Sequence, residues 1–139
     1  MREFLFRGKT SKGNWCYGYI GGSKEYPEFI FPFNDYIGIR VIPETVGQFT
    51  GLTDKNGKKI FEGDIVRVKI TQTEDIKTYG NCKYKVGFIV YNEDFALFTC
   101  KNNFMNFINW AFNDYEVIGN IHDNPELLEI ECCVTQQYF

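Results

Sequence analysis

The sequence lacks the features that define several large classes of protein. No run approaches the roughly 20 apolar residues that cross a bilayer. The opening residues MREFLFRGK carry charges where a secretory signal would be apolar. We therefore expect a cytoplasmic protein with no membrane partner. There is only one histidine, His122, so any catalytic site that needs a histidine must use it.

The cysteines do not form a recognisable site. Their number, five, is odd, and no CxxC spacing is present for a zinc knuckle or a redox turn. We expect buried or idle thiols, with no metal and no cofactor. The five are Cys16, Cys82, Cys100, Cys132 and Cys133.

Positive charge is missing from the last part of the chain. The net charge is −3, from 15 Lys and Arg against 18 Asp and Glu. Residues 102–139 hold six of the acids and no Lys or Arg, so residues 1–101 hold 12 acids and all 15 basic residues. This split would allow the tail of one copy to meet the basic surface of another in a homo-oligomer, although a solvated acidic edge is the commoner explanation.

The abundant residues are those of β-sheets and tight turns. Aromatic residues make up 18% of the chain, with 14 Phe and 9 Tyr, and there are 13 Gly against only 4 Pro. Aromatic rings suit the half-buried surface of a sheet. At 139 residues the chain is long enough for one core, so we predict a single, mainly β domain over residues 1–139.

The first half of the chain reads as strands separated by turns. Residues 3–7 and 14–20 form a predicted hairpin around turn residues 8–13, with Trp15, Tyr17 and Tyr19 on one face. Gly18 indicates a bulge or a close backbone approach. Two further short strands are predicted at residues 28–33 and 36–42, separated by Asn34-Asp35.

The clearest turn signals lie between residues 54 and 70. Asn56-Gly57 supplies the positive φ of a hairpin turn, and a second turn at residues 62–64 leads into a strand at residues 65–70. Alternation in that strand predicts one apolar face and one largely basic face that carries Arg67 and Lys69.

The second half continues in the same way. A hairpin is predicted from residues 84–91 and 95–100, and a last strand at residues 115–121. Asn124 before Pro125 predicts a cap and the start of a short C-terminal helix. Residues 71–81 show no strand pattern and look like a long connection, where a binding loop would lie.

No complete catalytic or nucleotide-binding motif is present. Asp54, Asn56 and Glu62 invite comparison with a calcium loop, but the glycine stands at the wrong position and a hairpin turn explains them. Neither GxGxxG nor GxxxxGK[ST] occurs. An enzyme would have to use His122 or a carboxylate such as Asp64, and it would need a pocket where these groups converge.

Basic residues offer a better candidate site. On a sheet with aromatic neighbours they could bind single-stranded nucleic acid, although the negative net charge opposes this interpretation. The candidates for contact with nucleic acid or another partner are Arg7, Lys9, Lys58, Lys59, Arg67 and Lys69.

Several segments together resemble the YopX-like family of phage and prophage proteins. They are residues 6–9, 13–19, 41–52, 54–66 and 117–128, and only residues 71–112 depart from the pattern. The resemblance implies a mostly β protein that contains an SH3-like small barrel, a phage or prophage origin and life in the bacterial cytoplasm. It implies no activity and supplies no catalytic residue.

These observations give a fold and three functional hypotheses. We predict a small barrel formed mainly by residues 60–121, with the N-terminal hairpin and strands of residues 1–50 packed on it and a short C-terminal helix. The first hypothesis is a non-enzymatic accessory protein that binds a macromolecule, which we expect to be a protein rather than a nucleic acid. The second is single-stranded nucleic-acid binding, and the third is an enzyme.

Overall fold

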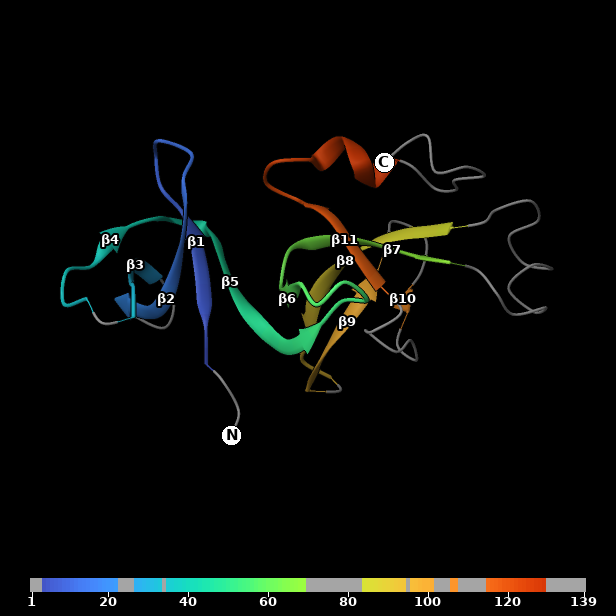
Figure 1. The fold of residues 1–139 in the computed structure, drawn as a ribbon, viewed down its shortest axis with the longest axis horizontal. Coiled ribbons are helices and arrows are strands. Elements are labelled where there is room, and N and C mark those ends of the chain that lie inside the picture. The colour runs from blue at the N-terminus through green and yellow to red at the C-terminus, as the bar shows by residue number, and fades with distance from the viewer. Residues whose placement is uncertain are drawn as a thin grey trace. The chain divides into compact units, whose positions relative to one another are not determined.

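A computed structural model describes residues 4–22, 27–33, 35–69, 84–94, 96–101, 106–107 and 115–129 (Figure 1). The chain forms two compact units, residues 1–51 and 52–139, which are described separately below. Within the described residues the regular elements are strands and one short 3-10 helix. The prediction of a mainly β protein is confirmed.

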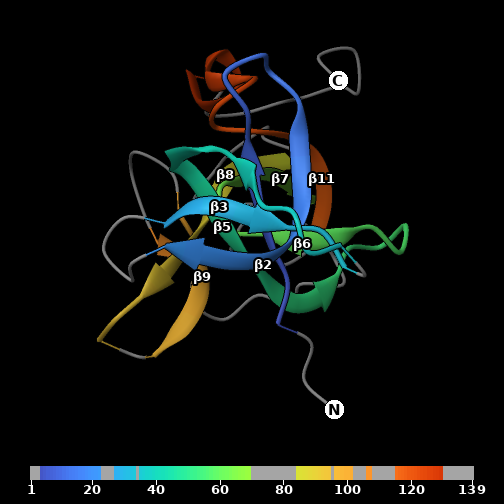
Figure 2. The same ribbon diagram turned by 90° about the vertical axis from the view of Figure 1, so that its left-hand side faces the viewer.

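The first unit is an antiparallel sheet. Its strands lie in the order β4-β3-β2-β1-β5, and β6 of the second unit follows β5. Figure 2 shows β2 and β3 side by side, as their pairing requires. The strands are β1 (Phe6–Lys9), β2 (Trp15–Gly22), β3 (Pro27–Phe31), β4 (Ile39–Arg40) and β5 (Ile42–Thr53), whose last two residues belong to the second unit.

The predicted N-terminal hairpin is present as β1 and β2. Its turn is closed by two backbone hydrogen bonds, from the N–H of Gly13 to the carbonyl of Thr10 and from the N–H of Thr10 to the carbonyl of Asn14. Gly13 has a φ of 90°, which an L residue rarely adopts. Residues 36–42 form less strand than predicted, because only Ile39–Arg40 pairs as β4 before β5 begins.

Gly18 of β2 has the close backbone approach that its position predicts. A Cβ atom there would overlap the backbone carbonyl of Phe31 and lie 2.9 Å from the Cα of Pro32. Backbone cannot move aside as the end of a flexible side chain can. The pairing of β2 with β3 therefore requires glycine at this position.

We expect Gly18→Ala to lower the free energy of unfolding by about 2 kcal/mol or more, because the added methyl group overlaps backbone. Gly57→Ala is the control. Gly57 has a positive φ, 82°, which Gly18 does not have, and a Cβ at Gly57 meets no atom within 4 Å, so we expect a loss of about 1 kcal/mol from the backbone conformation alone. Urea unfolding of both variants checks this. Equal losses would contradict the close approach at Gly18.

The second unit contains a second antiparallel sheet, in the order β10-β9-β8-β7-β11. The hairpin predicted at residues 84–100 is present as β8 and β9, and the last predicted strand is β11. The predicted connection at residues 71–81 lies outside the described residues. The elements are β6 (Lys59–Phe61), β7 (Asp64–Lys69), β8 (Tyr84–Asn92), β9 (Leu97–Lys101), β10 (Asn106–Phe107), β11 (Tyr115–Asn120) and the 3-10 helix Pro125–Glu129.

The structure differs from the prediction in two respects, the closure of the barrel and the C-terminal helix. In the strand orders of the described residues, neither sheet closes on itself, so the predicted SH3-like barrel is not confirmed. The C-terminal helix is a 3-10 helix that begins at Pro125, as predicted. Asn124 does not cap it in the expected way, because its Oδ1 accepts a hydrogen bond from the N–H of Asn120, 3.3 Å away.

The core of the second unit uses both faces of β7. Val66 and Val68 pack in one cluster with Ile60, Ile89, Cys100 and Tyr115. Ile65, on the opposite face, packs with Val86 in another cluster. All of β7 except its last residue is buried. Arg67, on the predicted basic face of this strand, is therefore buried, since strands lie on both sides of β7 and side chains pack over both of its faces.

Asp54 holds the turn between β5 and β6 to β11. Its Oδ1 accepts hydrogen bonds from the N–H groups of Asn56 and Lys58, both at 2.9 Å. Its Oδ2 accepts one from the N–H of Val117, also at 2.9 Å. Burial raises the pKa of this carboxyl, but the hydrogen bonds and the charge of Lys58 outweigh that effect, so the pKa lies below its usual value.

We expect Asp54→Asn to lower the free energy of unfolding at pH 7 by about 1–3 kcal/mol, because an amide cannot accept all three hydrogen bonds. Since the folded-state pKa of Asp54 is lowered, its contribution is present above the unfolded-state pKa and is lost as the pH falls through the folded-state value. The difference between wild type and variant in urea unfolding should therefore shrink below about pH 4. A difference that is the same at pH 3 and pH 7 would contradict this role of the ionised carboxylate.

Candidate functional site

The strand pairing of the first unit gathers aromatic and basic side chains on one face of its sheet. Residues directly opposite each other on antiparallel strands point to the same face. The pairs are Arg7 with Tyr17, Lys9 with Trp15, Tyr19 with Phe31 and Phe29 with Arg40. We call this set the aromatic face: Arg7, Lys9, Trp15, Tyr17, Tyr19, Phe29, Phe31 and Arg40.

The centre of the aromatic face is open to solvent. Tyr17 is 48% exposed and Tyr19 is 56% exposed. Trp15 and Phe31, on either side, are half-buried. The sequence predicted the shared face of Trp15, Tyr17 and Tyr19 from alternation alone, and the register confirms it.

Cation–π contacts hold two arginines of this face. The guanidinium of Arg7 lies over the ring of Trp15, 4.7 Å from the centroid, and Arg7 is almost fully buried. The guanidinium of Arg40 lies over Phe29 at 5.2 Å, and Arg40 is exposed. Stacking uses the flat face of a guanidinium and leaves its edge for hydrogen bonds. The two arginines therefore differ in access, and only Arg40 is open to a ligand.

Two glycines make room for the ring of Phe31. A Cβ at Gly21 would overlap the Phe31 ring, and one at Gly38 would lie 2.8 Å from its Cζ. The ring thus lies against backbone on two sides, which explains how a large residue stays half-buried at the edge of the aromatic face. Larger residues at positions 21 and 38 would push it out.

The segment after β3 extends the exposed apolar surface. The rings of Phe33 and Tyr19 meet edge to face, with centroids 4.6 Å apart. Tyr36 is 99% exposed and Ile37 is 74% exposed. Asp35 shapes this segment, because its Oδ1 accepts a hydrogen bond from the N–H of Ile37 at 3.0 Å. The sequence assigned residues 36–42 to a strand and so missed this exposed pair.

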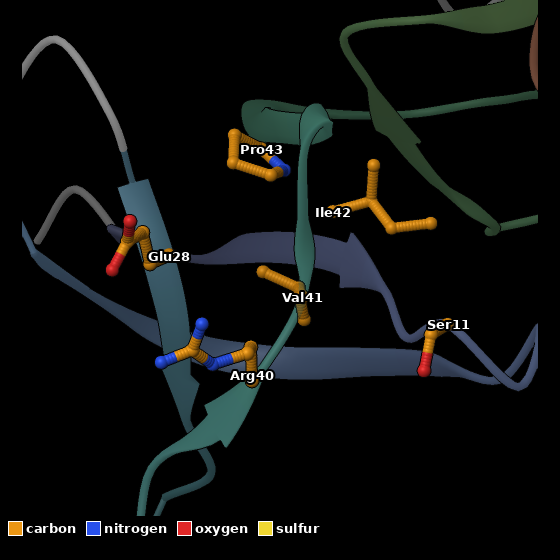
Figure 3. Close-up of a pocket in the computed structure, with 6 residues that line it drawn as sticks. All are labelled: Ser11, Glu28, Arg40, Val41, Ile42 and Pro43. Carbon is orange, nitrogen blue, oxygen red and sulfur yellow. The ribbon is translucent and has the colours of Figure 1, made fainter.

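A pocket of about 300 Å³ lies beside the edge of the same sheet. Figure 3 shows the charged ends of Glu28 and Arg40 on one side of Val41, with Ser11 and Ile42 on the other side. The lining residues are Ser11, Glu28, Arg40, Val41, Ile42 and Pro43. They come from three separate segments, and no signal in the linear sequence marked them as neighbours.

Comparison with known proteins places the chain in a family. Residues 9–129 match the family model described as YopX protein. The chain belongs to the YopX family. A search of curated proteins finds no match. The predicted family is thus confirmed, and it brings no activity with it.

A solved structure supports the same fold. It is described as the crystal structure of protein EF1440 from Enterococcus faecalis, and it is 23% identical in sequence with a TM-score of 0.55. The match covers 92% of this chain and 99% of that chain. At this level of identity the similarity shows the fold alone.

The six basic residues predicted for this YopX family member divide between the two units. Arg7 and Lys9 lie on the aromatic face of the first unit. Lys58, Lys59 and Lys69 are exposed in the second unit, whereas Arg67 is buried there. Whether any of them contacts a partner stays a prediction, but the burial of Arg7 and Arg67 makes these two poor candidates for direct contact.

Arg67 is held by a structural contact network. Its Nε donates a hydrogen bond to a carboxylate oxygen of Glu116 at 2.7 Å, and its guanidinium lies over the ring of Tyr84, 4.8 Å from the centroid. Lys55 lies 3.6 Å from the same carboxylate. A buried charge must be paired to be tolerated. This network explains how Arg67, on the predicted basic face of β7, can be buried.

The two residues considered for catalysis lie in or beside turns. Asp64 is buried, and its Oδ2 accepts a hydrogen bond from the N–H of Phe61 at 2.7 Å. The N–H of His122 bonds the Oδ1 of Asn120 at 3.0 Å in the turn after β11. Neither lines the pocket described above. Within the described part of the chain, no three His, Cys, Asp or Glu side chains gather to hold a metal ion.

None of the helices described in this structure is long and apolar enough to cross a membrane.

Of the cysteines, Cys82, Cys132 and Cys133 lie outside the described residues. Cys100 is buried in the core, and burial raises the pKa of its thiol to about 12, against smaller opposing effects from Tyr115 and Lys85. Cys16 is half-buried on β2. Of the two cysteines that the structure describes, Cys100 is therefore the less able to react at neutral pH.

We expect iodoacetamide at pH 8 to modify Cys100 only after unfolding, because the folded thiol is both covered and protonated. Mass spectrometry of peptides from native and urea-treated protein measures this. Cys16 serves as the internal comparison, since it is partly accessible, and it should react sooner. Modification of Cys100 in the native protein at the rate of Cys16 would contradict the buried position.

Proposed function

We propose that this YopX family member is a non-enzymatic accessory protein of a phage or prophage. In this proposal it acts in the bacterial cytoplasm and binds a protein partner through the aromatic face of its first unit. The observation that carries the proposal is the exposure of Tyr17 and Tyr19 at the centre of that face. Tyrosine provides a large, rigid contact surface with a polar end, and it is enriched where proteins bind one another.

The distribution of exposed apolar side chains supports the first unit as the contact region. Of twelve large hydrophobic side chains exposed in the described residues, nine belong to it. Large exposed apolar surfaces commonly mark interaction sites. The nine are Phe4, Tyr17, Tyr19, Ile20, Phe33, Tyr36, Ile37, Ile39 and Ile42.

Single-stranded nucleic acid is the second candidate ligand. The observation in its favour is that Lys9 and Arg40 share a face with aromatic rings, as in single-strand binders. Against it stand the net charge of −3 and the near-complete burial of Arg7. Phosphate binding needs accessible positive charge, so a protein partner fits these residues better.

The test compares the wild type with the double variant Tyr17→Thr/Tyr19→Thr, which keeps strand propensity but removes both rings. Tyr91→Thr is the matched control. Tyr91 is 46% exposed on β8, and it meets Phe98 edge to face at 5.2 Å, much as Tyr19 meets Phe33. Tagged forms of all three are used to capture proteins from a lysate of the bacterium that carries the gene, before and after nuclease treatment.

We expect one bacterial or phage protein to bind the wild type and Tyr91→Thr, with binding to the double variant weaker by about tenfold or more. Its affinity for each form is then measured with purified proteins. Equal binding by all three forms would overturn the proposal. Capture that nuclease abolishes, with a salt-dependent gel shift on single-stranded DNA, would replace it with nucleic-acid binding. Capture of its own copies alone would replace it with self-association.

A further inference from the structure

The pocket at the edge of the first sheet combines two opposite charges with an apolar wall. Glu28 contributes a carboxylate and Arg40 a guanidinium, while Val41, Ile42 and Pro43 contribute apolar surface. The N–H of Val41 bonds the carbonyl of Glu28 at 2.9 Å, so the backbone fixes the two segments that carry the charges. Ser11 adds a hydroxyl group from the turn between β1 and β2.

The two charged groups face the same side of the pocket without pairing. Figure 3 shows the carboxylate of Glu28 and the guanidinium of Arg40 on the β3 side of Val41. No ion pair within 4 Å joins Glu28 or Arg40 to any side chain in the described ranges. Both residues are exposed, so a ligand can reach them.

The guanidinium of Arg40 is also pre-organised for binding a carboxylate. The ring of Phe29 lies under its guanidinium, at 5.2 Å, and this contact limits the positions that the long side chain adopts. The edge of the guanidinium keeps its N–H donors, whose spacing matches the two oxygens of a carboxylate. Fixing the donor in advance lowers the entropy cost of binding.

We infer that this pocket binds a free α-amino acid with an apolar side chain. The carboxylate of the ligand meets Arg40, its ammonium group meets Glu28, and its side chain lies against Val41, Ile42 and Pro43. A volume of about 300 Å³ is at the small end of ligand pockets, which suits a ligand of this size. An anion or a cation alone would leave one of the two charges unmatched.

The inference does not depend on the proposed partner. That proposal concerns Tyr17 and Tyr19, neither of which lines the pocket. The double variant Tyr17→Thr/Tyr19→Thr should therefore bind an amino acid as the wild type does. Failure of one proposal leaves the other standing, and the two sets of variants separate them.

The experiment is a titration of the full chain with L-leucine, followed by the backbone amide signals of Ser11, Val41 and Ile42 in two-dimensional NMR. We expect these signals to shift together with a Kd on the order of 1 mM, because the pocket is small and open. N-acetyl-L-leucine, which lacks the positive charge, and L-leucinamide, which lacks the negative charge, should each bind about tenfold more weakly.

Single substitutions test which charged group of the ligand each charged residue of the pocket contacts. Glu28→Gln should weaken binding of L-leucine about tenfold and leave N-acetyl-L-leucine unchanged, since that ligand has no ammonium group. Arg40→Gln should weaken L-leucine equally and leave L-leucinamide unchanged. The control is Glu93→Gln, an exposed glutamate of the second unit, and thermal unfolding confirms that each variant is folded.

Three results would overturn the inference. The first is the absence of any shift at about ten times the expected Kd. The second is equal affinity for L-leucine and its two analogues, which would show that only apolar contact is made. The third is unchanged affinity in folded Glu28→Gln and Arg40→Gln, which would show that neither charge contacts the ligand.

Discussion

The pairing of β2 with a strand on each side is the constraint on which the proposed surface depends. Antiparallel pairing with β1 and with β3 holds every second side chain of β2 on one face. A shift of one residue would turn Tyr17 and Tyr19 to the opposite face. Gly18 helps to hold this register, because only glycine allows the backbone of Phe31 to come so close.

Charged side chains are part of the interior as well as the surface. Arg7 is covered by stacking on Trp15, and Arg67 by Glu116 and Tyr84. Asp54 and Asp64 are buried as acceptors of backbone hydrogen bonds. Each of these groups compensates the loss of water with a specific partner, since an uncompensated buried charge would be costly. A count of basic residues therefore overestimates the positive surface that a ligand meets.

Both proposals place binding in the first unit, for different reasons. The aromatic face provides exposed aromatic rings that a protein surface can cover. The pocket offers matched charges in a small volume. Arg40 belongs to both, because its stacking partner Phe29 is on the aromatic face while the residue itself lines the pocket. An amino acid bound at Arg40 would thus lie next to the surface proposed for the partner.

Local patterns predicted much of the fold. Gly57 has the positive φ expected of it, a turn is present at Gly63 as predicted, and Pro125 begins the C-terminal 3-10 helix. The strand predicted at residues 65–70 is present as β7 as far as Lys69, but Arg67 on its predicted basic face is buried. Alternation shows that Val66 and Arg67 point to opposite sides, yet it does not show whether another element covers each side.

The sequence by itself determined where strands and turns form and which residues of β2 share a face, because those properties depend on neighbours along the chain. The tertiary structure alone decided that Arg67 is buried beside Glu116, 49 residues away, while Arg40 stays exposed over Phe29. It also brought Ser11, Glu28 and Arg40 to one pocket. These contacts depend on the register between strands, and that register is set by packing over the whole sheet rather than by any single segment.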